Sequence, residues 1–367
     1  MKKIPVSLLI LLAFHCNYSF AQTADNKQKA IDIMRNAVKI MDNGQLDSSL
    51  VLLRQAAAMD PSNRDIPYEI AYAYYLAEKS DSTVAILTEL LKRVQHPQIY
   101  EMLGNAYDVL KQTDKALDAY NKGLEIDPKS SRLMLNKAIL YAYQDQADNA
   151  LNWFEKGIGA DPQFPSNYFW ASQLLAEKEK YVWALLYSEV FILYEPTSKR
   201  MNKLSEMMYN IYKNQITFTD SSAHVSLNKL VVMNINDLLD KNSKQKVKLP
   251  FEANYEMMVT LATVIPGKKE MSLALISELR SNFIKLYYSR KLNEEYPNAL
   301  LEFQKKIDDA QLTEPYTYVL LRYGNLEEFN SWVANGGEAK LKSLVTFLGD
   351  NYLNLDEKNY LHRDMYQ

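Results

Sequence analysis

Two consecutive stretches of this chain repeat one pattern, and they restrict its fold more than any other feature. The dipeptide Asp127-Pro128 ends the first stretch and Asp161-Pro162 ends the second, 34 residues later (162 − 128). Small residues, aromatic residues and an aspartate occupy matching positions in both. The matched pairs are Gly104 and Ala138, Tyr107 and Tyr141, Asp114 and Asp148, Ala116 and Ala150, Tyr120 and Phe154, and Gly123 and Gly157. Such a period predicts a repeated supersecondary unit.

The matched positions have physical reasons in a pair of antiparallel helices. Small residues such as Gly104 and Ala116 let the two helices of a hairpin approach closely, while Tyr120 fills the space between successive hairpins. Asp114 is expected to begin the second helix, where a carboxylate caps free amides and faces the positive end of the helix dipole. Pro128 lies just past that helix, where a missing N–H does no harm. The pattern therefore predicts helical hairpins.

The same register extends in both directions. Glu195-Pro196 closes a further unit after another 34 residues (196 − 162), and Asp60-Pro61 closes one that begins near Ala30. The unit between, residues 64–96, carries a one-residue deletion, because 128 − 61 is 67, one short of two periods. Five repeats are expected, near residues 30–63, 64–96, 97–130, 131–164 and 165–198. The pattern resembles the tetratricopeptide repeat (TPR), a helix–turn–helix unit with a period of about 34 residues.

This resemblance implies an all-α fold, a right-handed superhelix of about five helix–turn–helix repeats whose concave wall is formed by the first helix of each repeat. That wall commonly binds a peptide or a helix of a partner. The family's inward positions, carried over onto this chain, give a partner-binding groove. Its residues are Tyr68, Tyr72, Tyr75, Asn105, Arg132, Tyr143 and Phe169, with Glu101 and Asp108 among the further inward positions. The expected groove is aromatic and mildly acidic.

The first residues are expected to form a signal peptide rather than part of the fold. Lys2 and Lys3 precede an apolar run over residues 4–14, and Ser19-Phe20-Ala21 offers small residues to signal peptidase. The run is too short for a membrane span, which needs about 20 apolar residues. The sequence therefore predicts export and cleavage after Ala21, which leaves the protein in the periplasm or secreted, with no transmembrane segment in the mature chain.

Cys16 is the only cysteine, and it decides between a lipid-anchored and a free protein. A bacterial lipoprotein signal places a small residue directly before the modified cysteine. His15 stands there instead, which argues against a lipid anchor on Cys16. If Cys16 leaves with the signal peptide, the mature chain has neither a disulfide nor a thiol.

The pattern changes after the fifth repeat. Apolar residues between 204 and 212 share one face, which predicts a helix that caps the array, and from Asn214 onward the 34-residue period is lost. Helical spacing then returns as degenerate hairpins. The predicted domains are a signal peptide (1–21), a TPR array with its capping helix (22–216) and a second all-helical region (217–367). Because each repeat contacts mainly its neighbours, residues 22–216 are expected to fold without the rest.

No motif in the sequence carries chemistry. His96, His224 and His362 are far apart, and the ten glycines form no phosphate-binding loop. The formal charge of −3 gives no reason to expect nucleic acid as a partner. The sequence therefore predicts no enzyme, no cofactor and no metal site.

Recognition is the expected function, and three alternatives are open. The first is an exported scaffold or adaptor that binds another envelope protein or a peptide in its concave groove. The second is a glycan- or nutrient-binding protein of the cell envelope, because aromatic walls stack on sugars. The third is an enzyme with a site in the C-terminal region. The uninterrupted repeats favour the first, although the C-terminal region could also cover the groove tyrosines.

Overall fold

The computed structural model describes residues 25–219, 223–228, 249–264 and 270–366, and this part of the chain is mostly helical. The all-α fold expected from the sequence is confirmed. The chain divides into two compact units, Met1–Pro128 and Lys129–Gln367. Among the described residues, the one sheet is an antiparallel pair of short strands in which Ile216 lies opposite Val225.

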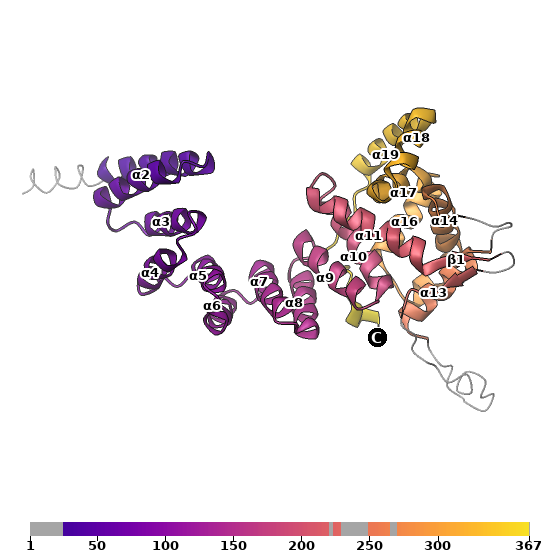
Figure 1. Ribbon diagram of the computed structural model, residues 1–367, viewed down its shortest axis with the longest axis horizontal. Helices are drawn as coiled ribbons and strands as arrows, with labels where there is room; N and C mark the ends of the chain where they lie inside the picture. The colour runs from indigo at the N-terminus through magenta and orange to yellow at the C-terminus, as the bar shows by residue number, and fades with distance from the viewer. Residues whose placement is uncertain (1–24, 220–222, 229–248, 265–269, 367) are drawn as a thin grey trace, which may run out of the picture. The chain divides into compact units, whose positions relative to one another are not determined.

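The first unit is a series of helical hairpins (Figure 1). Its elements are a helix over residues 25–42, α2 (Leu46–Met59), α3 (Asp65–Leu76), α4 (Ser80–Leu91), α5 (Pro97–Val109) and α6 (Thr113–Ile126). Its core is a set of small clusters, one that includes Leu53 and another that includes Leu87. This arrangement is expected where each hairpin packs mainly on its neighbours.

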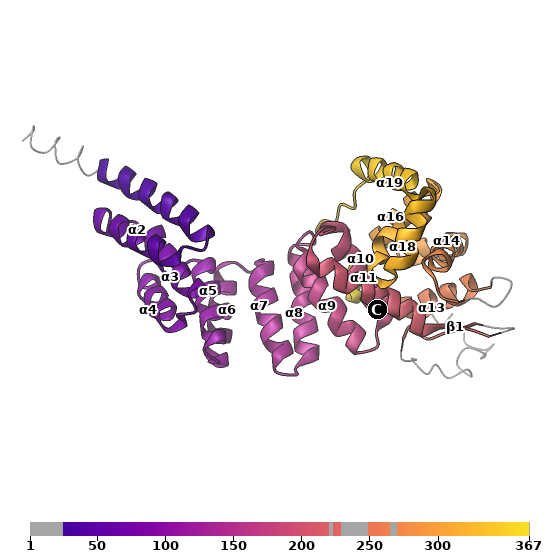
Figure 2. The same cartoon turned by 45° about the horizontal axis from the view of Figure 1, so that its top comes forward.

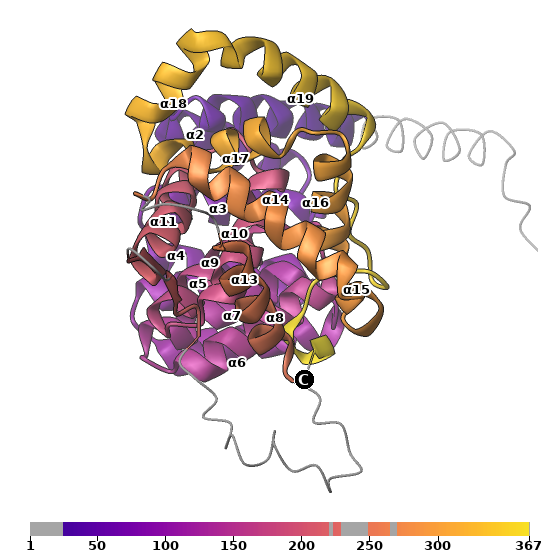
Figure 3. The ribbon, with the colours of Figure 1, turned by 90° about the vertical axis from the view of Figure 1, so that its right-hand side faces the viewer.

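The second unit adds the C-terminal region to the last repeats, whose helices α7 to α10 lie side by side in chain order (Figure 2). One hydrophobic core runs from Leu135 of α7 to Tyr366, on both sides of the predicted boundary at residue 216. The elements are α7 (Ser131–Tyr143), α8 (Ala147–Ala160), α9 (Pro165–Glu177), α10 (Tyr181–Tyr194), α11 (Lys199–Gln215), β1 (Ile216–Phe218), β2 (Ala223–Val225), α13 (Phe251–Ala262), α14 (Leu273–Ser289), α15 (Leu292–Glu295), α16 (Ala299–Asp309), α17 (Thr313–Leu321), η1 (Arg322–Gly324), α18 (Leu326–Trp332), η2 (Val333–Gly337), α19 (Glu338–Asp350) and η3 (Arg363–Tyr366). In the C-terminal region, α14 packs against both α13 and α16, as Figure 3 shows.

Gly104 occupies the close approach between α5 and α6 that the repeat predicts. A Cβ atom at Gly104 would lie 2.3 Å from Cε1 of Tyr120, far inside a normal contact. The Tyr120 ring is buried, and its hydroxyl donates a hydrogen bond to Oδ1 of Asn105 (2.8 Å). A glycine on the first helix therefore makes room for an aromatic ring from the second.

Gly104→Ala is expected to lower the free energy of unfolding by about 1–3 kcal/mol, because overpacking forces the ring and the backbone to shift. Gly349→Ala in α19 is the control, since a Cβ atom there meets nothing within 4 Å. That substitution should stabilise the protein by up to about 1 kcal/mol, because it removes a helical glycine. Urea denaturation of both variants checks the prediction, and an unchanged midpoint for Gly104→Ala would contradict it.

The second helices of the repeats begin differently from the expectation. α2, α4, α6 and α8 each start one residue before the aspartate of that repeat position, and none of these four helices has a side-chain cap at its N-cap residue. These aspartates are Asp47, Asp81, Asp114 and Asp148. The expectation that Asp114 caps free amides is therefore wrong. The aspartates lie in the first turn, where their charge still faces the positive end of the dipole.

A tight turn explains this start. Lys111, between α5 and α6, has a left-handed backbone (φ 58°), and the N–H of Gln112 donates to the carbonyl of Tyr107 (2.9 Å). This turn ends one helix and leads directly into the next, so the N-cap position falls on Gln112 rather than on an aspartate. Matching left-handed residues recur between the helices of the neighbouring repeats: Glu78, Asp145 and Glu179.

The same turn joins α16 and α17 in the C-terminal region. Gln311 has φ 58°, and the N–H of Leu312 donates to the carbonyl of Ile307 (2.9 Å). The helices on either side of Gln311 therefore form a hairpin of the repeat type, as the expectation of degenerate hairpins implied. The turn also sets an alignment in which Gln311 matches Lys111, 200 residues earlier (311 − 111).

Candidate functional site

The predicted groove tyrosines of the first unit lie on α3. Tyr68, Tyr72 and Tyr75 are each partly buried, and the first two pack against the cluster that includes Leu87. Burial raises the pKa of Tyr75, and the negative charge of Asp108 on α5 adds to the rise. The three rings are therefore partly exposed, and Tyr75 lies near a carboxylate of the next repeat.

The same first-helix face of this unit carries negative charge. Burial raises the pKa of Glu69, and the nearby carboxylates of Asp65 and Asp42 raise it further. On α5, Asp108 and Glu101 lie close enough to Tyr120 to add to the rise in its pKa that burial causes. An aromatic surface with several carboxylates is complementary to a peptide segment that has apolar and cationic side chains.

An exposed apolar side chain ends the first helix of three consecutive repeats. Leu76 is 41% exposed, Val109 is 51% exposed and Tyr143 is 71% exposed. They share one repeat position, since 109 − 76 is 33 and 143 − 109 is 34. Sequence reasoning identified only Tyr143, although the recurrence of an apolar residue at this position was visible in the alignment of the repeats.

The predicted groove residues of the second unit have different surroundings. Arg132 and Tyr143 are exposed, whereas Phe169 of α9 is buried. The guanidinium of Arg200 on α11 lies 5.1 Å from the Phe169 ring centroid and 5.1 Å from that of Phe191. Phe169 therefore belongs to the core at this place, and α11 covers it.

A cavity of about 370 Å³ lies between α11 and the turn that joins α9 to α10 in the fifth repeat. Its polar lining comes mostly from one helix, with Lys203, Asn210 and Asn214 exposed on α11. Met207, Ile211, Ala176, Tyr181, Glu206 and Gln215 complete the lining. The helix predicted as a cap thus also contributes a hollow polar surface.

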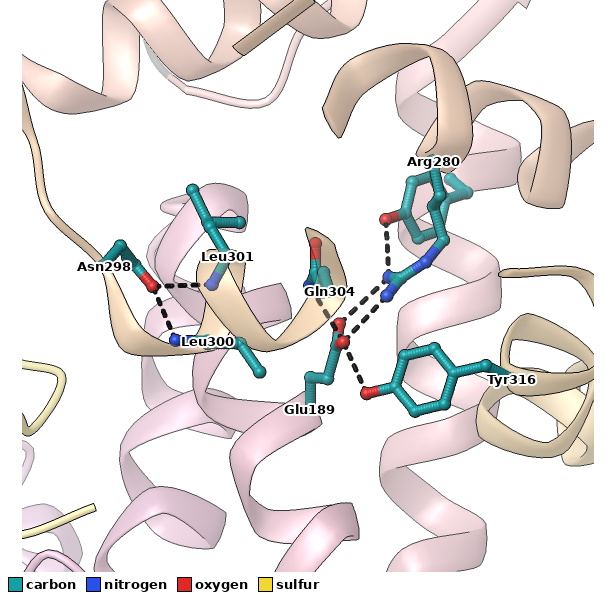
Figure 4. Close-up of polar contacts among 8 residues, drawn as sticks. Glu189, Arg280, Asn298, Leu300, Leu301, Gln304 and Tyr316 are labelled. Carbon is teal, nitrogen blue, oxygen red and sulfur yellow. Dashed lines mark hydrogen bonds and ion pairs between the residues drawn. The ribbon is translucent and has the colours of Figure 1, made fainter. Parts of the chain in front are cut away.

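A buried polar cluster joins the C-terminal region to α10, as Figure 4 shows. Oε1 of Glu189 accepts hydrogen bonds from Nη2 of Arg280 (2.7 Å), Nε2 of Gln304 (2.8 Å) and the hydroxyl of Tyr316 (2.7 Å). Oε2 of Glu189 accepts a further bond from Nη1 of Arg280 (2.9 Å). Glu189 is only 2% exposed, so the ion pair is closed to solvent.

The electrostatics of this cluster favour a charged ion pair that links α10 to α14. Burial opposes the charge of Arg280, but the adjacent Glu189 carboxylate more than offsets it and raises the pKa of the guanidinium. Gln304 and Tyr316 occupy the repeat positions of Gly104 and Ala116, 200 residues earlier. The degenerate hairpin α16–α17 thus carries two polar side chains where a repeat has small ones, and both bind Glu189.

His96 and His362 each accept a hydrogen bond from a nearby backbone N–H, whereas His224 lies in β2. Nδ1 of His96 accepts from the N–H of Gln98 at the start of α5 (3.3 Å), and Nδ1 of His362 accepts from the N–H of Asp364 (3.1 Å). In the part of the chain that the structure describes, no group of three or more His, Cys, Asp or Glu side chains could hold a metal ion. No helix in this part is long and apolar enough to span a bilayer.

Family models of the tetratricopeptide repeat match residues 97–130 and 131–164. Among curated proteins, the BBSome complex member BBS4 of Bos taurus is 23% identical over 126 residues, which is 34% of this chain. The chain spans about a quarter of the length of that relative (23%).

Solved structures that are similar to this chain include two bacterial proteins. PilF of Pseudomonas aeruginosa is 18% identical, and the match covers 51% of this chain and 85% of that chain with a TM-score of 0.45. TTC0263, a thermophilic TPR protein of Thermus thermophilus, is 16% identical, and the match covers 49% of this chain and 98% of that chain with a TM-score of 0.43.

Proposed function

Because the chain is a tetratricopeptide-repeat protein, we propose that it is a scaffold that holds another protein or a peptide against the first helices of its repeats. The observation that carries this proposal is the exposed apolar residue at one position of three consecutive repeats: Leu76, Val109 and Tyr143. Exposed apolar side chains that gather in a patch mark surfaces for protein partners, and the recurrence of these residues at one repeat position supports such a surface. The neighbouring tyrosines and carboxylates of the first unit favour a partner segment with apolar and basic residues.

The proposal also places the protein and its partner in the bacterial cell envelope. Its support comes from the sequence alone: the apolar run over residues 4–14, the cleavage site at Ser19-Phe20-Ala21, and His15 in place of a small residue before Cys16. These residues lie outside the described part of the structure. Cross-linking in the native host, followed by capture from the envelope fraction and mass spectrometry, tests both parts. Recovery of the chain only from the cytosol would contradict the envelope location.

Tyr143→Ala is expected to weaken capture of the cross-linked partner by about tenfold, a loss of about 1.4 kcal/mol, which is typical of an exposed aromatic hot spot. The free energy of unfolding should change by no more than about 0.5 kcal/mol, because the side chain is on the surface. Quantitative mass spectrometry of the captured partner and urea denaturation give the two measurements.

Val345→Ala provides the matched control. Val345 is 69% exposed on α19, close to the exposure of Tyr143, but it lies outside the repeats. This variant should retain capture. Equal capture by Tyr143→Ala and Val345→Ala would show that the exposed position of the repeats does not bind the partner.

A further inference from the structure

We propose that residues 353–366 form a strap that fills a second, separate binding site: a site for an extended peptide on the surface of α8 and α10. The strap is that peptide, supplied by the chain itself. Once the strap is released, the site binds the same sequence supplied in trans. This site uses the second helices of repeats 4 and 5, whereas the proposed function uses first helices.

The strap resembles a docked peptide in its conformation. After α19 ends at Asp350, the chain has no regular secondary structure until the short turn Arg363–Tyr366, and it runs back to the repeats (Figure 1). Leu355 and Leu361 are fully buried, whereas residues 356–359 between them are exposed. Buried anchors separated by exposed residues are typical of an extended peptide on a surface.

Side chains of the repeats bind the backbone of the strap directly. The N–H of Leu355 donates to the hydroxyl of Tyr194 at the end of α10 (3.0 Å). The carbonyl of the same leucine accepts from Nε2 of Gln163, which lies between α8 and α9 (3.0 Å). Nε2 of Gln163 also donates to Oδ1 of Asn354 (3.0 Å). Both backbone groups of one strap residue are therefore satisfied by the repeats.

Glu155 of α8 is the charged anchor of this site. Its carboxylate is buried. Oε2 accepts a hydrogen bond from Nη2 of Arg363 (2.9 Å). Oε1 accepts hydrogen bonds from the Tyr187 hydroxyl (3.0 Å) and from Nε of Arg363. Arg363 is the cation that forms an ion pair with this buried carboxylate, so release of the strap would leave the charge unpaired. A vacated site would therefore favour an arginine-bearing peptide.

Glu155 and Glu189 share one repeat position, since 189 − 155 is 34. Each is a buried glutamate on a second helix, and each forms an ion pair with an arginine from the C-terminal region, Arg363 and Arg280. The two repeats therefore form the same kind of buried ion pair. Glu189 pairs with Arg280 of α14, and Glu155 pairs with Arg363 of the strap.

An aromatic anchor ends the strap. The Tyr366 ring lies 4.8 Å from the Phe251 ring and 5.4 Å from the Trp183 ring, between centroids. Its hydroxyl donates to the carbonyl of Pro297 (2.7 Å). The site therefore takes an extended peptide with buried leucines, then an arginine, then a tyrosine three residues later. A second copy of this chain carries this pattern and must compete with the strap.

The test opens the strap within the full chain. A protease recognition site is inserted at Tyr352, which is 72% exposed. The chain is cut there, and a fluorescent synthetic peptide of residues 352–367 is added. We expect the peptide to bind the cut protein by fluorescence anisotropy and not the uncut protein. A peptide with Arg363→Ala should bind at least tenfold more weakly.

Matched controls separate the ion pair of Arg363 with Glu155 from nonspecific electrostatic attraction of a cationic peptide. A peptide with Lys358→Ala loses the same charge at an exposed position and should bind like the wild-type peptide. Glu155→Gln in the cut protein should weaken binding of the wild-type peptide. The proposal is wrong if the Arg363→Ala peptide binds as well as the wild-type peptide. It is also wrong if circular dichroism shows that the cut protein remains folded but the protein never exchanges its strap for the added peptide. Unfolding on cleavage that added peptide does not reverse would also refute it, because the segment would then be part of the core.

Discussion

Glu189→Ala is expected to lower the free energy of unfolding of the second unit by about 3–5 kcal/mol. The substitution leaves the buried Arg280 without its counter-ion, and breaking a buried ion pair from one side has this cost. Gln304 and Tyr316 lose the acceptor of their hydrogen bonds at the same time. Urea denaturation followed by circular dichroism measures the change, and hydrogen exchange shows whether α10, α14 and α16 become less protected.

Two further variants separate the charge effect from packing. In the double variant Glu189→Leu with Arg280→Met, both buried charges are replaced by apolar groups, so much of the lost stability should return. Glu206→Ala removes an exposed glutamate of α11 and should change the free energy of unfolding by no more than about 0.5 kcal/mol. If Glu189→Ala were as stable as Glu206→Ala, the cluster would not anchor the C-terminal region.

A chain cut short after residue 216 is expected to lose the cooperative fold of α9, α10 and α11. Residues Val182–Ile192 of α10 are all buried, and the core that covers them continues through the C-terminal region. Re-exposing large apolar side chains such as Trp183 costs about 1.5–3 kcal/mol for each. This expectation replaces the one drawn from the sequence, in which residues 22–216 fold without the rest.

The comparison uses fragments 22–216 and 22–128. The second ends where the first compact unit ends, and that unit has clusters of its own, so it should keep its helices. Circular dichroism, thermal melts and size-exclusion chromatography distinguish the two fragments. A cooperative, monomeric melt of fragment 22–216 would contradict the prediction and would make the C-terminal region an addition to a complete fold.

The repeats could be predicted because their signals are local. Gly104 and Tyr120 meet across one hairpin, 16 residues apart, and Pro128 lies two residues after the end of α6. The cap expected at Asp114 was wrong because the start of that helix depends on the left-handed turn at Lys111, which spacing alone does not reveal.

The candidate sites were less predictable because they depend on distant parts of the chain. Phe169 was assigned to an open wall, but Arg200 covers its ring from α11, a helix expected only to cap the array. The placement of Tyr68, Tyr72 and Tyr75 as partner contacts stays a prediction. A signal for the buried anchors was present, since a glutamate recurs at positions 155 and 189 on the second helices of two repeats, but the arginines they bind lie beyond the last repeat.

The two buried ion pairs also set the order in which the protein can fold. Arg280 lies 91 residues from Glu189, and Arg363 lies 208 residues from Glu155. Closing loops of this length has an entropic cost that contacts within one hairpin avoid, so structures that depend on them form slowly. The hairpins of the first unit can form as soon as their own residues leave the ribosome, whereas the contacts of the fourth and fifth repeats with the C-terminal region form only after that region is synthesised. During synthesis, therefore, buried surfaces such as that of α10 remain uncovered longest.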